Sequence, residues 1–560
     1  MEPAICPNYK DIFEQSNEAY DELLADMPSR EVIIVLFKIC DYINHGASDE
    51  ELLDAVLKKC SDDELRNVKE KYSLFKSNSP IKNVFILSRY HLLNMIAKEV
   101  SRNCIVDLDD AKFNWFKILK AYLLSCDEIS ASKYLSSKNT WNEKNIWSYS
   151  WAILIDQFEL GERVCPFYEK YRFISLLMFL SKDLNIINEF LTFMELETVN
   201  DFWRIFINIE TELSTNIDEA FLRNSFLVPK GKFSIFLKKF SINTKQQKCK
   251  GKISDFKIFP LYQLSETHFY VIDYTLFRKK IYKEFLFAVW ENTLLKKKYS
   301  NFSDFKNLIS KEVSEQVCFH DVLKALISKS ASFLKVDDGS DALPDLYLRI
   351  RNKIFLIEFK DYLLPDKLLN TPTAENIQKY IDLRFIKSDR DKPKGINQLS
   401  SFIQKIANGQ LKFDEGLSKR ISNEEKIIIC PIICYSEYNY SMPGIADYLN
   451  DHFSKNTFKY DRIKVNDLRM VSLKVFLDFY LRGQSFKDFM ILLDKFSTYK
   501  LKTLVKSRAS FSFEYLSSLE EFYNSTYDFS SKRPVKNNKI DKLLSRYSSL
   551  YSVFDQKVST

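Results

Sequence analysis

Histidine, glycine and proline are all scarce in this chain of 560 residues. Ten glycines and 14 prolines exclude the collagen-like and glycine-rich repeat classes. The five histidines are scattered along the chain, so a metal site built from histidine is not expected. The ten cysteines include no Cys-x-x-Cys pair, which argues against structural zinc, and we expect most of them to pack as small apolar side chains.

Several signatures of common enzymes and of targeting segments are also missing. The sequence has no Gly-x-x-x-x-Gly-Lys-Ser/Thr loop, so a P-loop nucleotide hydrolase is not expected. It has no Gly-x-Gly-x-x-Gly, His-Glu-x-x-His or Gly-x-Ser-x-Gly motif either. No apolar run approaches the length of a membrane span, and the first residues lack the basic and apolar parts of a signal peptide. We therefore expect a soluble, cytoplasmic protein with no membrane partner.

The charge that is present is unevenly distributed. The net charge is +7, but residues 1–64 hold 16 Asp/Glu against 5 Lys/Arg, a balance of −11. Residues 223–298 hold 17 Lys/Arg against 5 Asp/Glu, a balance of +12. Such asymmetry favours a polyanionic partner, most simply nucleic acid, with DNA expected before RNA. The alternative is a set of solvated lysine-rich helix faces.

The pattern of apolar residues predicts a multidomain α plus α/β protein. Two Ser-x-x-Glu capping boxes, at 48–51 and 61–64, precede helical segments near the N-terminus. We expect four segments: a helical domain at 1–222, for scaffolding, sensing, or binding a protein partner or a second copy; a basic connector with a short hairpin and a helix at 223–300; an α/β domain at 301–485; and a basic, Ser-rich helical appendage at 486–560.

The basic connector contains the sequence KQQKCKGK, which predicts an exposed loop. Its lysines Lys248, Lys250 and Lys252 are candidates for binding a phosphate backbone. Beyond the loop, Phe256–Leu264 and His268–Asp273 are expected to form two strands joined by a polar turn. The segment Leu276–Leu295 is expected to be helical.

The most informative stretch is residues 343–360, LPDLYLRIRNKIFLIEFK. Two alternating runs flank Arg351-Asn352, and Asn tolerates the left-handed backbone of a tight hairpin. That turn pairs Ile350 with Lys353 and places Asp345 opposite Glu358. Cross-strand neighbours lie about 4.5–5.5 Å apart at Cβ, so both carboxylates could share one cation.

The alternation also separates the two faces of the hairpin. One face carries only apolar side chains and is expected to be the core: Leu346, Leu348, Ile350, Phe355, Ile357 and Phe359. The other face gathers Asp345, Glu358 and Lys360 at the end away from the turn. A surface ion-pair cluster is the alternative explanation for these three charged residues.

This arrangement resembles the PD-(D/E)xK nuclease superfamily, which has a restriction-endonuclease-like fold. Its signature is a Pro-Asp pair followed, on the next strand, by an acid-x-Lys triplet, here Pro344-Asp345 and Glu358-Phe359-Lys360. The resemblance covers about residues 303–480. It implies a mixed sheet flanked by helices, and Mg²⁺ or Mn²⁺ held by Asp345, Glu358 and the Phe359 carbonyl.

The surroundings fit the same resemblance. The superfamily core runs helix, three strands, helix, strand, and the first helix often supplies an acid; Glu315 is the candidate here, with Glu312 as the substitute. Some members carry a Gln near the active site, which Gln398 matches. Phe402 occupies the Tyr place of the Gln-x-x-x-Tyr motif of one exonuclease branch, so that branch is not indicated.

The resemblance implies a metal-dependent nuclease in which Lys360 orients or deprotonates the attacking water, or offsets charge on the phosphate. The other hypothesis is a non-catalytic nucleic-acid-binding or assembly protein that keeps a nuclease-like fold. A third is a bacterial defence or restriction effector whose helical half gates the nuclease. That last hypothesis rests on domain layout alone.

Overall fold

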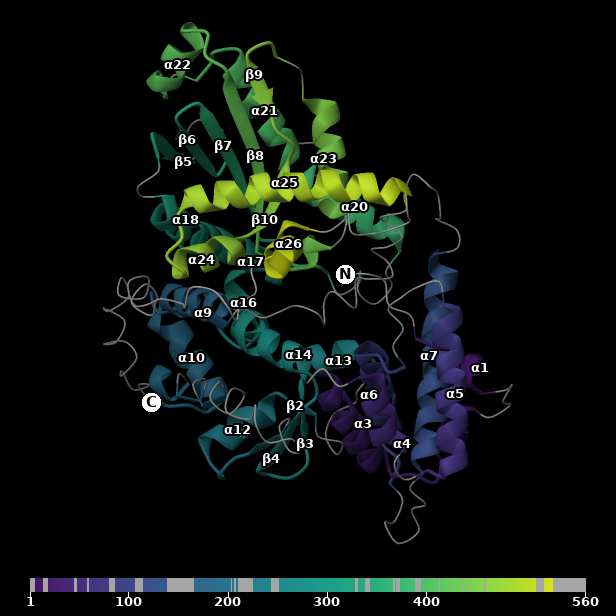
Figure 1. The fold of residues 1–560 in the computed structure, drawn as a ribbon. Coiled ribbons are helices and arrows are strands. Elements are labelled where there is room, and N and C mark those ends of the chain that lie inside the picture. Colours follow the sequence, from purple (N-terminus) through teal and green to yellow (C-terminus); the bar gives the residue numbers. More distant parts are fainter. Residues whose placement is uncertain are drawn as a thin grey trace. The chain divides into compact units, whose positions relative to one another are not determined.

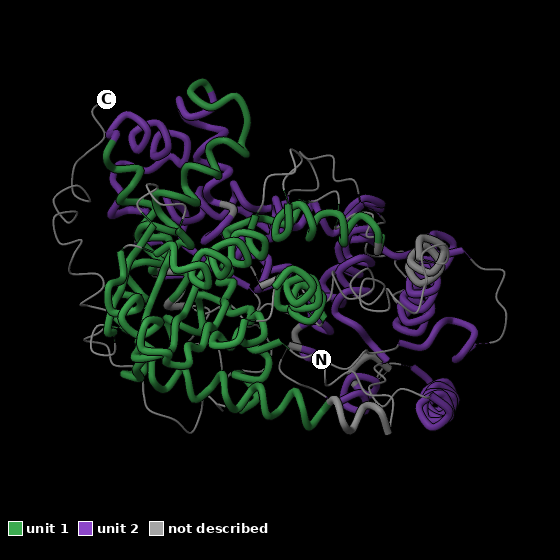
Figure 2. Tube along the Cα trace, turned by 90° about the horizontal axis from the view of Figure 1, so that it is seen from above, with its two compact units in different colours: residues 1, 140–182, 297–551 green, residues 2–139, 183–296, 552–560 purple. Residues whose placement is uncertain are grey.

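The structure is a computed structural model, and its fold combines helices with two mixed sheets (Figure 1). Contacts divide the chain into two compact units, coloured separately in Figure 2. The structure describes residues 6–13, 19–44, 48–57, 60–79, 86–105, 114–137, 166–202, 204–205, 208–209, 225–242, 251–327, 331–337, 343–365, 368, 373–387, 394–411, 413–436, 438–442, 444–457, 460–509 and 518–526.

The first unit comprises residues 140–182 and 297–551 with Met1, and the second comprises residues 2–139, 183–296 and 552–560. This division differs from the four segments that the sequence predicts. Residues 140–182 group with the α/β part instead of with the other N-terminal helices, and residues 223–296 group with the N-terminal helices.

Among the described residues, none of the helices combines the length and apolar character needed to cross a membrane.

The second unit is mainly helical. Both predicted capping boxes are confirmed: the Ser48 N–H donates to Glu51 and the Ser61 N–H to Glu64, at the starts of α4 and α5. The helices of this unit are α1 (Tyr9–Ile12), α2 (Tyr20–Leu23), α3 (Ser29–Asn44), α4 (Asp49–Leu57), α5 (Asp62–Asn78), α6 (Arg89–Arg102), α7 (Trp115–Ser137), α10 (Leu184–Met194), α12 (Lys232–Lys239), α13 (Ile253–Ile258), α14 (Tyr274–Lys279), the π-helix η2 (Lys280–Glu284) and α15 (Phe285–Glu291), with α16 (Leu295–Lys298) at the boundary between the units.

A four-stranded sheet completes the second unit, in the order β1 (Ser225–Leu227), β4 (His268–Val271), β3 (Leu261–Gln263), β2 (Ser241–Ile242). The predicted antiparallel hairpin is present as β3 and β4, but the expected strand over 256–264 is too long. Residues 253–258 form helix α13 instead, because the Asp255 carboxylate accepts the Lys252 N–H and caps the helix start. Lys252 is exposed there, whereas Lys248 and Lys250 lie outside the described residues.

The first unit is built on a six-stranded sheet. Its main path runs β10 (Arg469–Ser472), β8 (Ile427–Tyr435), β7 (Lys353–Lys360), β6 (Leu346–Ile350), β5 (Phe333–Val336), and β9 (Ile463–Val465) also pairs with β8 (Figure 1). Strands β5, β6 and β7 are antiparallel, whereas β8 is parallel to β7, β9 and β10. The continuous apolar run at 427–435 is therefore a central strand.

Helices surround this sheet, and one of them changes its winding. The helix that carries Glu315 begins as a π-helix, η3 (Ser310–Phe319), and continues as an α-helix, α18 (His320–Ile327). The other helices of the unit are α9 (Pro166–Leu180), α17 (Phe302–Ile309), α20 (Ala374–Phe385), α21 (Ile396–Ala407), α22 (Glu415–Ser422), the 3-10 helix η4 (Tyr438–Ser441), α23 (Ile445–Asn456), α24 (Leu473–Leu481), α25 (Phe486–Ala509) and α26 (Leu519–Thr526).

The β6–β7 hairpin has the predicted register, with Ile350 paired with Lys353 and Leu346 with Ile357. The residue that adopts the left-handed backbone is Arg351, with φ of 55°, and not Asn352. The Asn352 side chain instead donates to the Lys426 carbonyl at 3.1 Å, which ties the turn to the start of β8.

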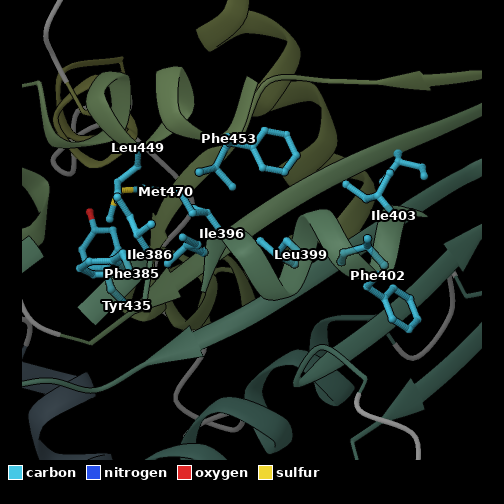
Figure 3. Packing of buried hydrophobic residues seen from close by; sticks show 14 of the residues in the cluster. Phe385, Ile386, Ile396, Leu399, Phe402, Ile403, Tyr435, Leu449, Phe453 and Met470 are labelled. Carbon is cyan, nitrogen blue, oxygen red and sulfur yellow. The ribbon is translucent and has the colours of Figure 1, made fainter. Parts of the chain in front are cut away.

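Both faces of this hairpin are buried, so the prediction of a single core face was incomplete. Tyr347, Ile354 and Leu356 are fully buried in the cluster formed with α20, α21 and α23, part of which Figure 3 shows. On the opposite face, the Phe355 ring packs against Phe486 of α25, with centroids 5.1 Å apart. The charged residues of the hairpin therefore lie at the end of a strand that is covered on both sides.

The start of the predicted C-terminal appendage belongs to this unit. Helix α25 crosses the strands (Figure 1), and the Tyr435 hydroxyl at the end of β8 donates to Glu520 of α26 at 3.3 Å. Large apolar side chains such as Phe489 and Phe496 explain why these residues pack on the sheet rather than extend from it. Residues 527–560 lie outside the described part.

Candidate active site

The Pro-Asp pair and the Glu-x-Lys triplet meet at one end of the β6–β7 hairpin. Asp345 is half-buried in a bend directly before β6, next to the last ladder pair, Leu346 with Ile357. Its Oδ2 accepts the Phe359 N–H at 2.5 Å, so the carboxylate reaches across to the neighbouring strand. The sequence predicted that Asp345 lies opposite Glu358; the described ladder ends one pair earlier, and the Asp345 carboxylate bonds the next residue, Phe359.

Glu358 and Lys360 are both buried, with 2% and 9% of their surfaces exposed. The Lys360 Nζ lies 2.6 Å from Glu358 Oε1 and donates a hydrogen bond to it. The second carboxylate oxygen, Oε2 of Glu358, is buried and has no hydrogen-bond partner among the described residues. A buried oxygen without a partner is costly, and it marks a place where a cation or a donor would be stabilised.

Glu315 from the π-helix η3 is the third acid of this group. Burial raises the pKa of its carboxyl group; Lys360 lowers that pKa, and Glu358 raises it again. The net result is that the pKa of Glu315 is raised above the ordinary value of a glutamate. Glu312, the substitute candidate, is half-buried one turn earlier. The Glu315 carboxylate interacts with the charges of both Glu358 and Lys360.

Like Glu315, Asp345 and Lys360 have shifted pKa values. Burial, then the neighbouring Glu358, raises the pKa of Asp345 well above the ordinary value of an aspartate. Burial alone would lower the pKa of Lys360, but Glu358 and Asp345 raise it, so Lys360 is held as a cation. Three carboxylates and one ammonium therefore share a desolvated site, which is typical of functional sites.

Two other predicted residues make different contacts. Gln398 is exposed at the start of α21, where its Oε1 accepts the Gly395 N–H at 2.8 Å and caps the helix. None of its described contacts involves the acids. The Phe359 ring stacks on Phe319 of η3, with centroids 4.8 Å apart, which holds the helix of Glu315 against β7.

Sequence analysis missed Asp361, which directly follows the triplet. It is buried and contacts Lys306 Nζ at 2.6 Å and Arg172 at 3.4 Å. It also accepts hydrogen bonds from the hydroxyls of Ser310 and Ser436. Burial would raise its pKa, but Lys306 and Arg172 lower it far below the ordinary range. In the sequence, only its position next to Lys360 could have indicated a role for Asp361, because Lys306 and Arg172 lie 55 and 189 residues away from it.

His320 was also missed, because no motif surrounds it. It is 1% exposed at the start of α18, bonds the backbone of Asp345, and leaves its Nε2 without a partner among the described residues. Burial and the nearby Lys324 lower its pKa to about 4, so the ring is neutral at physiological pH. A neutral imidazole thus supports the bend that presents Asp345.

The donor set at this site suits a hard divalent cation. Asp345, Glu358 and Glu315 offer only oxygen atoms, which fit Mg²⁺ or Mn²⁺ better than zinc. A divalent cation is also favoured because Oε2 of Glu358 has no hydrogen-bond partner among the described residues and because the acids outnumber the lysine. Within the described residues, however, no three Asp, Glu, His or Cys side chains converge into a ready-made metal-binding group. In this conformation the Lys360 Nζ donates a hydrogen bond to Oε1 of Glu358, where a metal ion would otherwise bind.

No protein-family model, no curated protein and no solved structure matches the chain.

Proposed function

We propose that the chain is a divalent-metal-dependent nuclease that hydrolyses phosphodiester bonds, with DNA as the expected substrate. One observation carries this proposal: Asp345, Glu358 and Glu315 are gathered with Lys360 at the buried end of β7. With all four ionised, the group has a net charge of −2, which a divalent cation would neutralise. A purely structural ion pair would need only one acid for the lysine.

The order of elements supports the same proposal. The helix over residues 302–327 is followed by three antiparallel strands, then helices α20, α21 and α22, then the parallel strand β8. This order agrees with the core of the PD-(D/E)xK superfamily, in which a helix, three strands, a helix and a strand follow one another and the signature residues lie at the second and third strands. The match favours a restriction-endonuclease-like fold for residues 302–472.

Each charged side chain has a role in this proposal. Asp345, Glu358 and Glu315 would hold Mg²⁺ or Mn²⁺, and the Phe359 carbonyl is a further candidate ligand. When bound, such an ion polarises the scissile phosphate and acidifies an attached water. Because the two acids keep Lys360 protonated, its Nζ donates hydrogen bonds to the phosphate or to the attacking water and does not act as the base.

A second function is favoured by a different observation. The Lys360–Glu358 ion pair and the lack of a converged metal-binding group among the described residues suit a protein that binds nucleic acid without cleaving it. The two proposals differ in one measurable property, which is cleavage that depends on a divalent metal.

The test is a cleavage panel with supercoiled, linear and single-stranded DNA and with RNA, each with Mg²⁺, Mn²⁺ or a chelator. We expect metal-dependent cleavage that Asp345→Asn and Lys360→Ala abolish. Lys353→Ala is the matched control, because Lys353 lies on the same strand at the end away from the site. Binding without cleavage under every metal condition would favour the second function.

A further inference from the structure

Asp361 links four segments of the first unit at the end of β7. Lys306 comes from α17, Ser310 begins η3, Arg172 comes from α9, and Ser436 follows β8. Two buried cations face one carboxylate, so the cluster is held by ionic contacts as well as by hydrogen bonds. Charge-assisted hydrogen bonds of this kind are stronger and geometrically tighter than neutral ones.

The contacts fix the main chain of Asp361 as well as its side chain. Lys306 Nζ lies 2.6 Å from Asp361 Oδ2 and 3.2 Å from the Asp361 carbonyl oxygen. The single Ser310 Oγ–H is shared between the same two acceptors, Oδ2 at 3.1 Å and the carbonyl oxygen at 3.2 Å, and Ser310 Oγ accepts from Lys306 Nζ at 2.8 Å. Because Asp361 is the next residue after Lys360, these bonds determine where the peptide that carries Lys360 lies.

The π winding of η3 connects the same contacts to Glu315. Ser310 is the first residue of η3, and Glu315 lies five residues later. A π-helix closes its hydrogen bonds over five residues, so positions five apart stand roughly above one another. In an α-helix they would be turned by about 140°. The π winding therefore brings Glu315 to the side of the helix that Ser310 anchors to the end of β7.

We propose that Asp361, Lys306 and Ser310 form a positioning unit that sets Glu315 against Lys360 and Glu358. The inference rests on the proposed nuclease function, since it assigns these residues to the assembly of the metal-binding acids. The three residues are positioning residues: they contact the strand end and the helix start, and not the substrate. The stacking of Phe359 on Phe319 holds the far end of η3 to the same strand.

The decisive comparison is Ser310→Ala with Ser436→Ala. Both remove one hydroxyl that donates to the Asp361 carboxylate, but only Ser310 lies on the helix that carries Glu315. In the full-length chain, we expect Ser310→Ala to lower kcat roughly tenfold to a hundredfold, because small misplacements of site groups have such effects. KM should change little, and Ser310→Thr should restore most of the activity.

A second readout uses Mn²⁺ alone, with binding followed by electron paramagnetic resonance. Ser310→Ala should weaken Mn²⁺ binding several-fold, and Ser436→Ala should bind like the wild-type chain, although thermal melts show a similar loss of stability for both. Equal effects of the two substitutions on kcat and on Mn²⁺ affinity would overturn the inference. A wild-type chain that neither binds Mn²⁺ nor cleaves would instead overturn the proposed function, and the inference with it.

Discussion

Asp345 and Asp361 are two acids near the end of β7, and the same substitution should affect protein stability in opposite directions at the two positions. Burial, and after it the neighbouring Glu358, raises the pKa of Asp345, whereas Lys306 and Arg172 outweigh burial at Asp361 and lower its pKa. Asparagine is nearly isosteric with aspartate, and at position 345 its oxygen still accepts the Phe359 N–H.

The expected magnitudes follow from these surroundings. At pH 7, Asp345→Asn should raise the free energy of unfolding by about 0.5–2 kcal/mol, because it removes a half-buried carboxylate that Glu358 repels. Asp361→Asn should lower it by about 3–5 kcal/mol, because two buried cations lose their counter-ion. The two variants should therefore differ by roughly 3.5–7 kcal/mol.

The dependence on pH should also be opposite for the two positions. The raised pKa of Asp345 means that the unfolded chain ionises first, so the stability cost appears as pH rises above about 4 and is absent in acid. The lowered pKa of Asp361 means that its contribution is complete above about pH 4 and is lost as pH falls. The gain from Asp345→Asn should thus grow with pH.

Urea denaturation at several pH values, with and without Mg²⁺, measures these effects. In the wild-type chain, Mg²⁺ at 100 times its Kd should add about 2.7 kcal/mol, and Asp345→Asn should lose most of that gain. Destabilisation by Asp345→Asn across the whole pH range would show that Asp345 is held by favourable contacts, and the electrostatic argument for the site would then be refuted.

Three further predictions test other parts of the structure. Because the pKa of His320 is lowered to about 4, the unfolded chain takes up a proton that the folded chain does not, and the free energy of unfolding should fall by about 3 kcal/mol as pH falls from 6.5 to 4. His320→Gln should flatten the dependence of the free energy of unfolding on pH in that range. Leu356→Asp and Ile357→Asp should each cost about 4 kcal/mol or more in urea denaturation because both faces of β7 are buried, whereas the exposed Lys464→Asp should cost little. Neutralising Lys248, Lys250 and Lys252 together in an Asp345→Asn background should reduce the slope of log K against log salt for oligonucleotide binding by about two to three, and an unchanged slope would mean that these lysines contact no phosphate.

Local sequence pattern determined the hairpin, its register and the meeting of its charged residues. Strand alternation and a two-residue turn are properties of neighbouring residues, so residues 343–360 alone were enough to pair Ile350 with Lys353. The same locality explains the success of the capping boxes at Ser48 and Ser61, where the bonded groups are three residues apart.

Only the tertiary structure decided what surrounds that hairpin. Burial of both faces depends on α21 and α25, which approach from later parts of the chain, and alternation within a strand says nothing about them. The contact between Asp361 and Arg172 joins residues that are 189 positions apart in the sequence. Residues 140–182 therefore belong to the unit that contains the six-stranded sheet, although residues 183–296 between them and that unit belong to the other one. The π winding that brings Glu315 toward the site likewise depends on how η3 is anchored to β7 at Asp361 and Phe359. Such features follow from the packing of distant segments, which minimises the exposure of apolar surface and the cost of buried charge together, and no local pattern encodes that balance.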